Sequence, residues 1–341
     1  MQANVVNVLI YSVLHFTAAT NFYSVNVKIV KMKYRKRRFI PGECMHIYQR
    51  AVKGYIVFYD LEDFLVFYMI FSTFARLYKV RILEMCIMTN HVHILISADD
   101  LDEVSRFIMR YTSVFVREYN DAIGRRGPLF HKSFGSAPKK GGKSIRSTIV
   151  YIGNNPVEKE LSATAEGYRW TFFRYMNQDG VALKSLRKMG YRLRKACKYV
   201  DMIRARSTYL TYAQLRKLMK GMTMEEKNIL ADHIIMAYFP FDVDALLSFY
   251  NSYEDMLIAM RSTSGKDYDI KETYLPEPDT IYHKMAEVLR YSGFCNDGNL
   301  LRTLTVAPDA EKFRVAQLLR AHTGATVQQI SRFLHFDIQK R

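Results

Sequence analysis

Two histidines separated by a single residue lie inside the apolar run MTNHVHILIS at residues 88–97. Successive side chains of a β-strand point to opposite faces, so His91 and His93 share one face while Val92 and Ile94 point to the other. A pair of imidazoles on one face can supply half of a metal site, or it can be two hydrogen-bonded histidines of a core. Both interpretations remain open on these residues alone.

A second group of polar side chains lies on a predicted helix that starts at Ser144 as N-cap and ends at Pro156. Its inward face is apolar, with Ile145, Ile149 and Ile152. Tyr151 and Asn155 are four residues apart and therefore share a face of this helix. Tyr151 is one of 24 tyrosines, and its type alone favours a packing role.

The segments around these residues alternate between the strand period and the helix period. We expect strands at 46–52, 79–88 and 91–97, and helices at 60–78 and 101–119. Asp60 is the predicted N-cap of the first helix, with Asp63 three residues later. Strand, helix, strand, strand, helix is the beginning of a ferredoxin-like α+β sandwich, an antiparallel sheet with helices on one face.

The composition favours a polyanionic partner. The 341 residues include 50 Lys and Arg against 33 Asp and Glu, for a formal net charge of +17. Such self-repulsion is a cost unless a partner neutralises it, and nucleic acid is the simplest partner. The four cysteines form no CxxC pair, which argues against a zinc ribbon or a disulfide framework and fits a reducing cytoplasm.

Composition also divides the chain into three parts. Residues 1–39 join an uncharged leader to the basic arm KMKYRKRR at 31–38, and we interpret Met32 as the start of translation. Polar residues interrupt the leader too early for a spanning helix, so no membrane partner is expected. Residues 40–180 contain the strands and helices above, and 181–341 form a basic, mainly α-helical C-terminal region. Near its end we expect two helices joined at Gly324, the second capped by Thr326.

Three motifs in this order resemble the REP-associated, single-tyrosine HUH transposases: MTNHVHILI, GPLFHKSF at 127–134, and YIGNNPVEKEL at 151–161. HIYQRAVKGYIVFYDLEDFLVFY at 46–68 and EGYRWTFFRYM at 166–176 resemble the first strand and helix and the closing segment of that family. The resemblance covers about residues 40–176. YIGNNPV stands where the family more often has YIHLNPV, and TNHVH where PNHVH is commoner.

The resemblance implies roles for individual residues. His91 and His93 would bind a divalent metal, Mg²⁺ or Mn²⁺, and Asn155 would complete the site. Tyr151 would be the nucleophile that attacks a DNA phosphate and forms a 5′-phosphotyrosine. We also expect basic residues to contact the phosphates of single-stranded or hairpin DNA: Lys33, Arg35, Lys36, Arg37, Arg38, Lys139, Lys140, Lys143 and Arg146.

The function predicted from the sequence is metal-dependent nicking and joining of single-stranded DNA near hairpins or palindromic repeats, in the cytoplasm with the nucleoid. The alternative is a domesticated, non-catalytic protein that binds DNA hairpins. An RNA-binding module is disfavoured because the candidate strands carry no RNP-type aromatic motif. The sequence leaves the choice between monomer and homodimer open.

Overall fold

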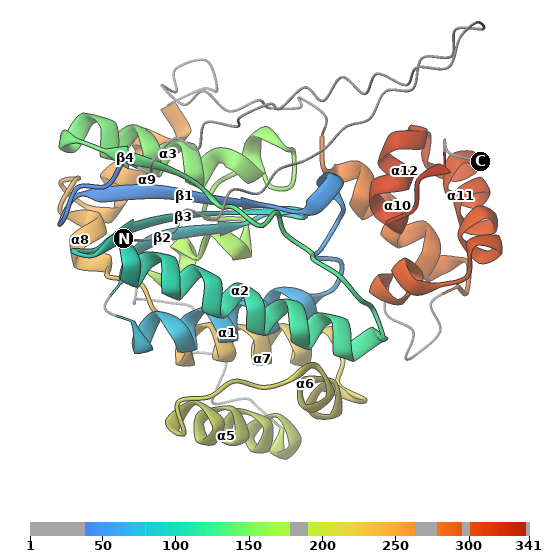
Figure 1. The fold of residues 1–341 in the computed structure, drawn as a ribbon. Helices are drawn as coiled ribbons and strands as arrows, with labels where there is room; N and C mark the ends of the chain where they lie inside the picture. Colours follow the sequence, from blue (N-terminus) through green and yellow to red (C-terminus); the bar gives the residue numbers. More distant parts are fainter. Residues whose placement is uncertain (1–37, 79, 178–189, 263–277, 295–300, 339–341) are drawn as a thin grey trace, which may run out of the picture. The chain divides into compact units, whose positions relative to one another are not determined.

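In the computed structural model, a four-stranded antiparallel sheet carries both histidines (Figure 1). Its strands are β1 (Cys44–Arg50), β2 (Arg81–Ile87), β3 (His91–Ser97) and β4 (Gly135–Lys139), in the order β2-β3-β1-β4. With one helix after β1 and one after β3, this order is that of the ferredoxin-like α+β sandwich. The predicted fold class is therefore confirmed, and β1 begins two residues before the predicted start.

The structure describes residues 38–78, 80–177, 190–262, 278–294 and 301–338. The described residues from Phe39 onward belong to one compact unit. The leader, nearly all of the basic arm and the predicted domain boundary near 180 lie outside the described residues. No helix in the described ranges has both the length and the apolar composition needed to cross a bilayer.

Helices α1 (Leu61–Leu77) and α2 (Leu101–Ile123) cover one face of the sheet (Figure 1). The predicted cap of α1 is present as a reciprocal capping box between Asp60 and Asp63. On this face of the sheet, Gln49 donates a hydrogen bond to Thr112 of α2 at 2.9 Å and accepts one from the Tyr111 hydroxyl. The buried stripe of α2 follows the helical period: Val104, Phe107, Ile108, Tyr111, Val114, Phe115 and Tyr119.

Helix α3 (Gly141–Glu158) lies against the opposite face of the sheet (Figure 1). It begins one turn before Ser144, with Lys140 as N-cap, so the predicted cap is wrong. Pro156 also does not end the helix but lies inside its last turn. A proline there removes only one backbone hydrogen bond, and its fixed φ is compatible with a helix, so two more residues follow it.

The later helices are α5 (Tyr191–Ala205), α6 (Tyr212–Met219), α7 (Met224–Ala237), α8 (Val243–Leu247) and α9 (Tyr253–Ser262). Helices α6 and α7 pack against α1, and α5 packs on α7, whereas α9 packs against α3 and α8 contacts β2. Helix α1 is apolar all round, and its solvent side is covered in part by α7, where the Tyr68 hydroxyl donates to the Ile235 carbonyl at 3.0 Å. One continuous apolar core therefore runs from Cys44 of β1 to Met260 of α9.

Helices α10 (Thr280–Tyr291), α11 (Asp309–Thr323) and α12 (Val327–Leu334) share a second apolar cluster, which also contains Ile56. As predicted, the two helices are joined at Gly324 and Thr326 is the N-cap of the second. The structure adds that Gly324 is left-handed and that Thr326 forms a capping box with Gln329. The 3₁₀ helix η4 (Leu301–Val306) carries Arg302, whose fully buried guanidinium pairs with Asp63 at 2.6 Å.

Candidate functional site

His91 is oriented by the residue that precedes it. Its Nδ1 lies 2.7 Å from Oδ1 of Asn90, and Nδ2 of Asn90 donates to the Gly54 carbonyl at 3.3 Å. The second bond fixes the amide orientation, so Oδ1 faces His91 and must accept a proton from Nδ1. This tautomer leaves the lone pair on Nε2, the arrangement that a metal ligand requires.

His93 is fully buried and is paired with a third histidine, His46 of β1. Nδ1 of His93 lies 3.0 Å from Nε2 of His46, while Nε2 of His93 has no hydrogen-bond partner among the described residues. Burial lowers the pKa of His46 to about 3 and that of His93 well below its usual value. Both rings are therefore neutral near pH 7, and each keeps one nitrogen lone pair.

Tyr151 and Asn155 project from α3 toward these histidines. The Tyr151 ring centroid lies 5.5 Å from that of His93 and 5.9 Å from that of His46, edge-on to both. Nδ2 of Asn155 donates to the Tyr151 carbonyl at 2.9 Å, which turns Oδ1 away from that carbonyl. Asn155 is fully buried, and its Oδ1 has no hydrogen-bond partner among the described residues. The fold thus gathers the four residues that the sequence predicted for catalysis and metal binding.

The donor atoms at this site fit a divalent metal. Burial lowers the pKa of His91 to about 3, helped by the cations Arg50 and Lys159 and opposed by the nearby Asn155 side chain. Two neutral imidazoles and one amide oxygen are available, a mixed nitrogen and oxygen set that would leave the other coordination positions of a metal to further ligands. No group of three His, Cys, Asp or Glu in the described ranges is arranged to hold a metal. The fit therefore depends on the amide of Asn155.

Comparison with known families finds a match to this region of the chain. The model of the family described as Transposase IS200 like matches residues 22–155. This part of the chain is similar to the IS200-like transposases. A solved chain described as a REP-associated tyrosine transposase bound to a REP hairpin is 16% identical, with a TM-score of 0.36, and the match covers 44% of this chain and 87% of that one. No curated protein matches the sequence.

The two positions at which this chain departs from the YIHLNPV motif contact helix α9. A Cβ on Gly153 would lie 2.8 Å from Cε2 of Phe173 and 3.0 Å from Cε of Met260. Asn154 donates to the Met260 carbonyl at 2.8 Å from a buried position. Both departures therefore belong to the packing of α3 against a later helix.

A second contact joins the C-terminal region to the turn before His91. Oδ2 of Asp279, at the start of α10, accepts a hydrogen bond from the Thr89 hydroxyl at 2.6 Å, and both side chains are buried. The backbone N–H of Asp279 donates to the Lys159 carbonyl at 3.1 Å. Asp279 thus connects the β2–β3 turn to the residue that follows α3.

The predicted DNA-binding residues fall into three groups. Lys33, Arg35, Lys36 and Arg37 lie outside the described residues, and Arg38 is exposed. Lys140, Lys143 and Arg146 are exposed around the first turns of α3, which carry no acidic residue. Lys139 is 92% buried instead, with a relative exposure of 8%, and it acts on His46 by lowering its pKa.

Sequence reasoning missed three residues beside the histidines. Arg50 lies opposite His91 in the β1–β3 register, and Lys159 follows α3. His46, whose Nε2 contacts His93, is also absent from the predicted site residues. No motif marks these residues, because their proximity to the site arises from strand register and from the position at which α3 ends.

Proposed function

We propose that the protein is a metal-dependent transposase that nicks and rejoins single-stranded DNA beside hairpins through Tyr151. The observation that carries the proposal is the packing of Tyr151 against His93 and His46, with two buried ligand atoms, Nε2 of His93 and Oδ1 of Asn155, left without partners. Leaving two buried polar atoms unpaired costs stability unless a ligand satisfies them.

In the proposed reaction, the Tyr151 oxygen attacks the phosphorus of a DNA phosphodiester. The new bond is a phosphotyrosine ester at the 5′ side, and the bond to the 3′ oxygen breaks. The phenol releases one proton to solvent and the departing 3′ oxygen takes one up, so the step balances. The ester conserves the energy of the broken bond, and a 3′ hydroxyl that attacks it rejoins a strand without a nucleotide cofactor.

His91, His93 and Asn155 would hold the divalent metal, Mg²⁺ or Mn²⁺. When bound, the metal withdraws charge from the phosphate and orients it. Asn90 and His46 would keep the two ligand imidazoles in the required tautomers. Two imidazoles and an amide oxygen favour Mg²⁺ or Mn²⁺ over a structural Zn²⁺, which prefers four closed ligands.

The charges of the domain support a DNA substrate. Arg50 and Lys159 lie near His91, where they can bind the phosphate under attack. Lys140, Lys143 and Arg146 surround the N-terminal end of α3, and the dipole of that helix adds to their attraction for phosphates. Hairpin DNA is the substrate that the resemblance to REP-associated transposases supports, and we propose that the protein acts with the nucleoid in the cytoplasm.

A covalent-adduct assay tests the proposal. The full chain is incubated with labelled single strands that contain a hairpin, with Mn²⁺ or Mg²⁺ or with a chelator, and resolved on a denaturing gel. We expect a shifted band that requires metal and is absent from Tyr151→Phe. Tyr291→Phe is the matched control, because this tyrosine is 89% exposed at the end of α10.

The other outcomes separate the alternatives. An adduct that persists in Tyr151→Phe would refute the assigned nucleophile. Salt-sensitive binding of hairpins without any adduct from the wild-type protein would instead support the non-catalytic hairpin-binding protein. An adduct that forms equally well with the chelator would refute the role of the metal.

A further inference from the structure

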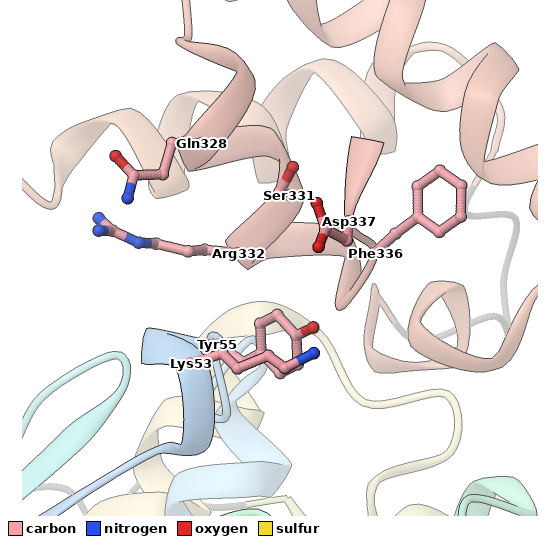
Figure 2. Close-up of a pocket in the computed structure, with 7 residues that line it drawn as sticks. All are labelled: Lys53, Tyr55, Gln328, Ser331, Arg332, Phe336 and Asp337. Carbon is pink, nitrogen blue, oxygen red and sulfur yellow. The ribbon is translucent and has the colours of Figure 1, made fainter. Parts of the chain in front are cut away.

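A pocket of about 400 Å³ lies between the loop that follows β1 and helix α12 (Figure 2). The loop supplies Lys53 and Tyr55, and α12 with the residues after it supplies Gln328, Ser331, Arg332 and Asp337. Figure 2 shows Arg332 and Gln328 extending toward the same side, with the Tyr55 ring below Asp337. The predicted site includes none of these residues.

Both walls of the pocket are held in place. Lys53 has φ of 56° and Gly54 φ of 67°, a backbone conformation that a lysine rarely adopts. The Ile56 N–H donates to the Arg332 carbonyl at 3.1 Å, and Nε2 of His335 donates to the Ile56 carbonyl at 2.6 Å. Uncommon backbone conformations that the surrounding structure maintains are concentrated at functional sites.

The pocket is joined directly to the candidate metal site. The Gly54 carbonyl in its loop accepts a hydrogen bond from Nδ2 of Asn90, and Oδ1 of the same amide orients His91. One side chain therefore separates the pocket wall from a predicted metal ligand. A DNA strand whose phosphate lies at His91 would continue past this loop.

The chemistry of the lining matches one unpaired nucleotide. Lys53 and Arg332 offer positive charge for a phosphate, and Asp337 and Gln328 can accept or donate hydrogen bonds at a base edge. The Tyr55 ring stacks on His335, with ring centroids 4.4 Å apart, and Nζ of Lys53 lies over the ring at 5.7 Å from its centroid. The remaining apolar surface of the ring can contact a base beside this cation. The volume lies near the lower end of ligand pockets, about 300–1,000 Å³, and is too small for a duplex.

We propose that this pocket binds one unpaired nucleotide of the DNA strand, next to the phosphate that Tyr151 attacks. The inference rests on the proposed function and adds to it a role for the C-terminal region. Helix α12 then helps to select strands with a single-stranded flank beside the hairpin. The contacts combine charge for the backbone with polar groups that distinguish bases.

Binding measurements without catalysis test this pocket. Fluorescence anisotropy in the full chain compares a labelled hairpin that carries a short single-stranded flank with the same hairpin lacking it, over a range of salt concentrations. For the flanked strand, log affinity falls as log salt rises. We expect Lys53→Gln and Arg332→Gln each to make this slope less steep by about 0.7. We expect Tyr55→Leu to weaken binding of that strand about tenfold.

The flank-free hairpin should bind all three variants as it binds the wild type. Arg320→Gln is the matched control, because Arg320 is exposed on α11. Equal losses for both DNAs, or no loss for the flanked strand, would overturn the proposal. Circular dichroism and thermal unfolding identify a variant that fails to fold. If a variant does fail to fold, a photo-crosslinking experiment on the wild-type chain tests the same pocket.

In that second measurement, 4-thiothymidine is placed at successive flank positions and crosslinked peptides are identified by mass spectrometry. We expect one position to crosslink to the peptide that contains Tyr55, and crosslinks confined to other regions would overturn the proposal. Failure of the proposed function looks different. In that case the wild type forms no phosphotyrosine adduct, whether or not the flank contributes to binding.

Discussion

Replacing His46 tests whether the buried histidine pair prepares a metal ligand. His46→Phe removes the ring nitrogen 3.0 Å from Nδ1 of His93 while it keeps an aromatic ring of similar size. The Nδ1–H tautomer of His93, which exposes Nε2 for metal, then loses its acceptor. Loss of a hydrogen-bond partner of a metal-binding histidine typically weakens metal affinity 10- to 100-fold, or about 1.4–2.7 kcal/mol.

The assay is a calorimetric titration of the DNA-free protein with Mn²⁺ near neutral pH. His46→Gln is the conservative variant, since its amide oxygen can accept the proton from Nδ1 of His93 and should restore most of the affinity. His131→Ala is the control at an exposed histidine. A folded His46→Phe protein that binds Mn²⁺ as tightly as the wild type would refute the reasoning. If His91→Ala also left the affinity unchanged, the metal site itself would be refuted.

Three further predictions concern buried groups. Arg302→Met removes the ion-pair partner of the buried Asp63 carboxylate. It should lower the free energy of unfolding, measured in urea, by about 3–5 kcal/mol. Gly135→Ala places a Cβ 1.9 Å from Cζ of Tyr48, so the ring must move, and we expect a loss of about 1–3 kcal/mol by thermal unfolding. Burial raises the pKa of Glu84 well above its usual 4.5, so the folded chain keeps a proton that the unfolded chain releases. Stability should therefore fall as pH rises from about 5 to about 8, and urea unfolding of Glu84→Gln should lack this fall.

Each of these variants has a matched control at an exposed position. Arg290→Met breaks a pair with Asp60 in which the arginine side chain is 49% exposed, and should cost less than about 1 kcal/mol. Gly142→Ala meets no atom within 4 Å, and Glu254→Gln changes an exposed carboxylate. If a control variant changed stability, or its pH dependence, as much as the matching buried variant, burial would not be the cause of the effect.

Local signals in the sequence predicted the fold where neighbouring residues decide the structure. The capping boxes at Asp60 and Thr326 and the left-handed Gly324 depend on contacts within about four residues, and the structure contains all three. The predicted start and end of α3 were wrong, although they too were based on single residues in the sequence. The serine was interpreted as the N-cap and the proline as the end of the helix, but α3 begins before the serine and continues past the proline.

The residues of the candidate site also fall into those that the local sequence predicts and those that depend on contacts between distant segments. The sequence alone predicted the face shared by His91 and His93 and the face shared by Tyr151 and Asn155, because each follows from a strand or helix period. It did not predict that His46 would contact His93, since that contact needs the β1–β3 register, in which His46 lies opposite Leu95. Contacts between distant strands are not encoded in the period of either strand.

The C-terminal region shows most clearly why a motif can change while its chemistry is preserved. Gly153 and Asn154 lie between Tyr151 and Asn155 on α3, and both replaced positions face α9. A side chain at 153 would meet Phe173, and a residue at 154 without an amide would leave the Met260 carbonyl without its donor. The substitutions therefore follow from the added helix rather than from relaxed demands on the tyrosine. Under this interpretation the C-terminal helices are part of what positions α3 against the histidines.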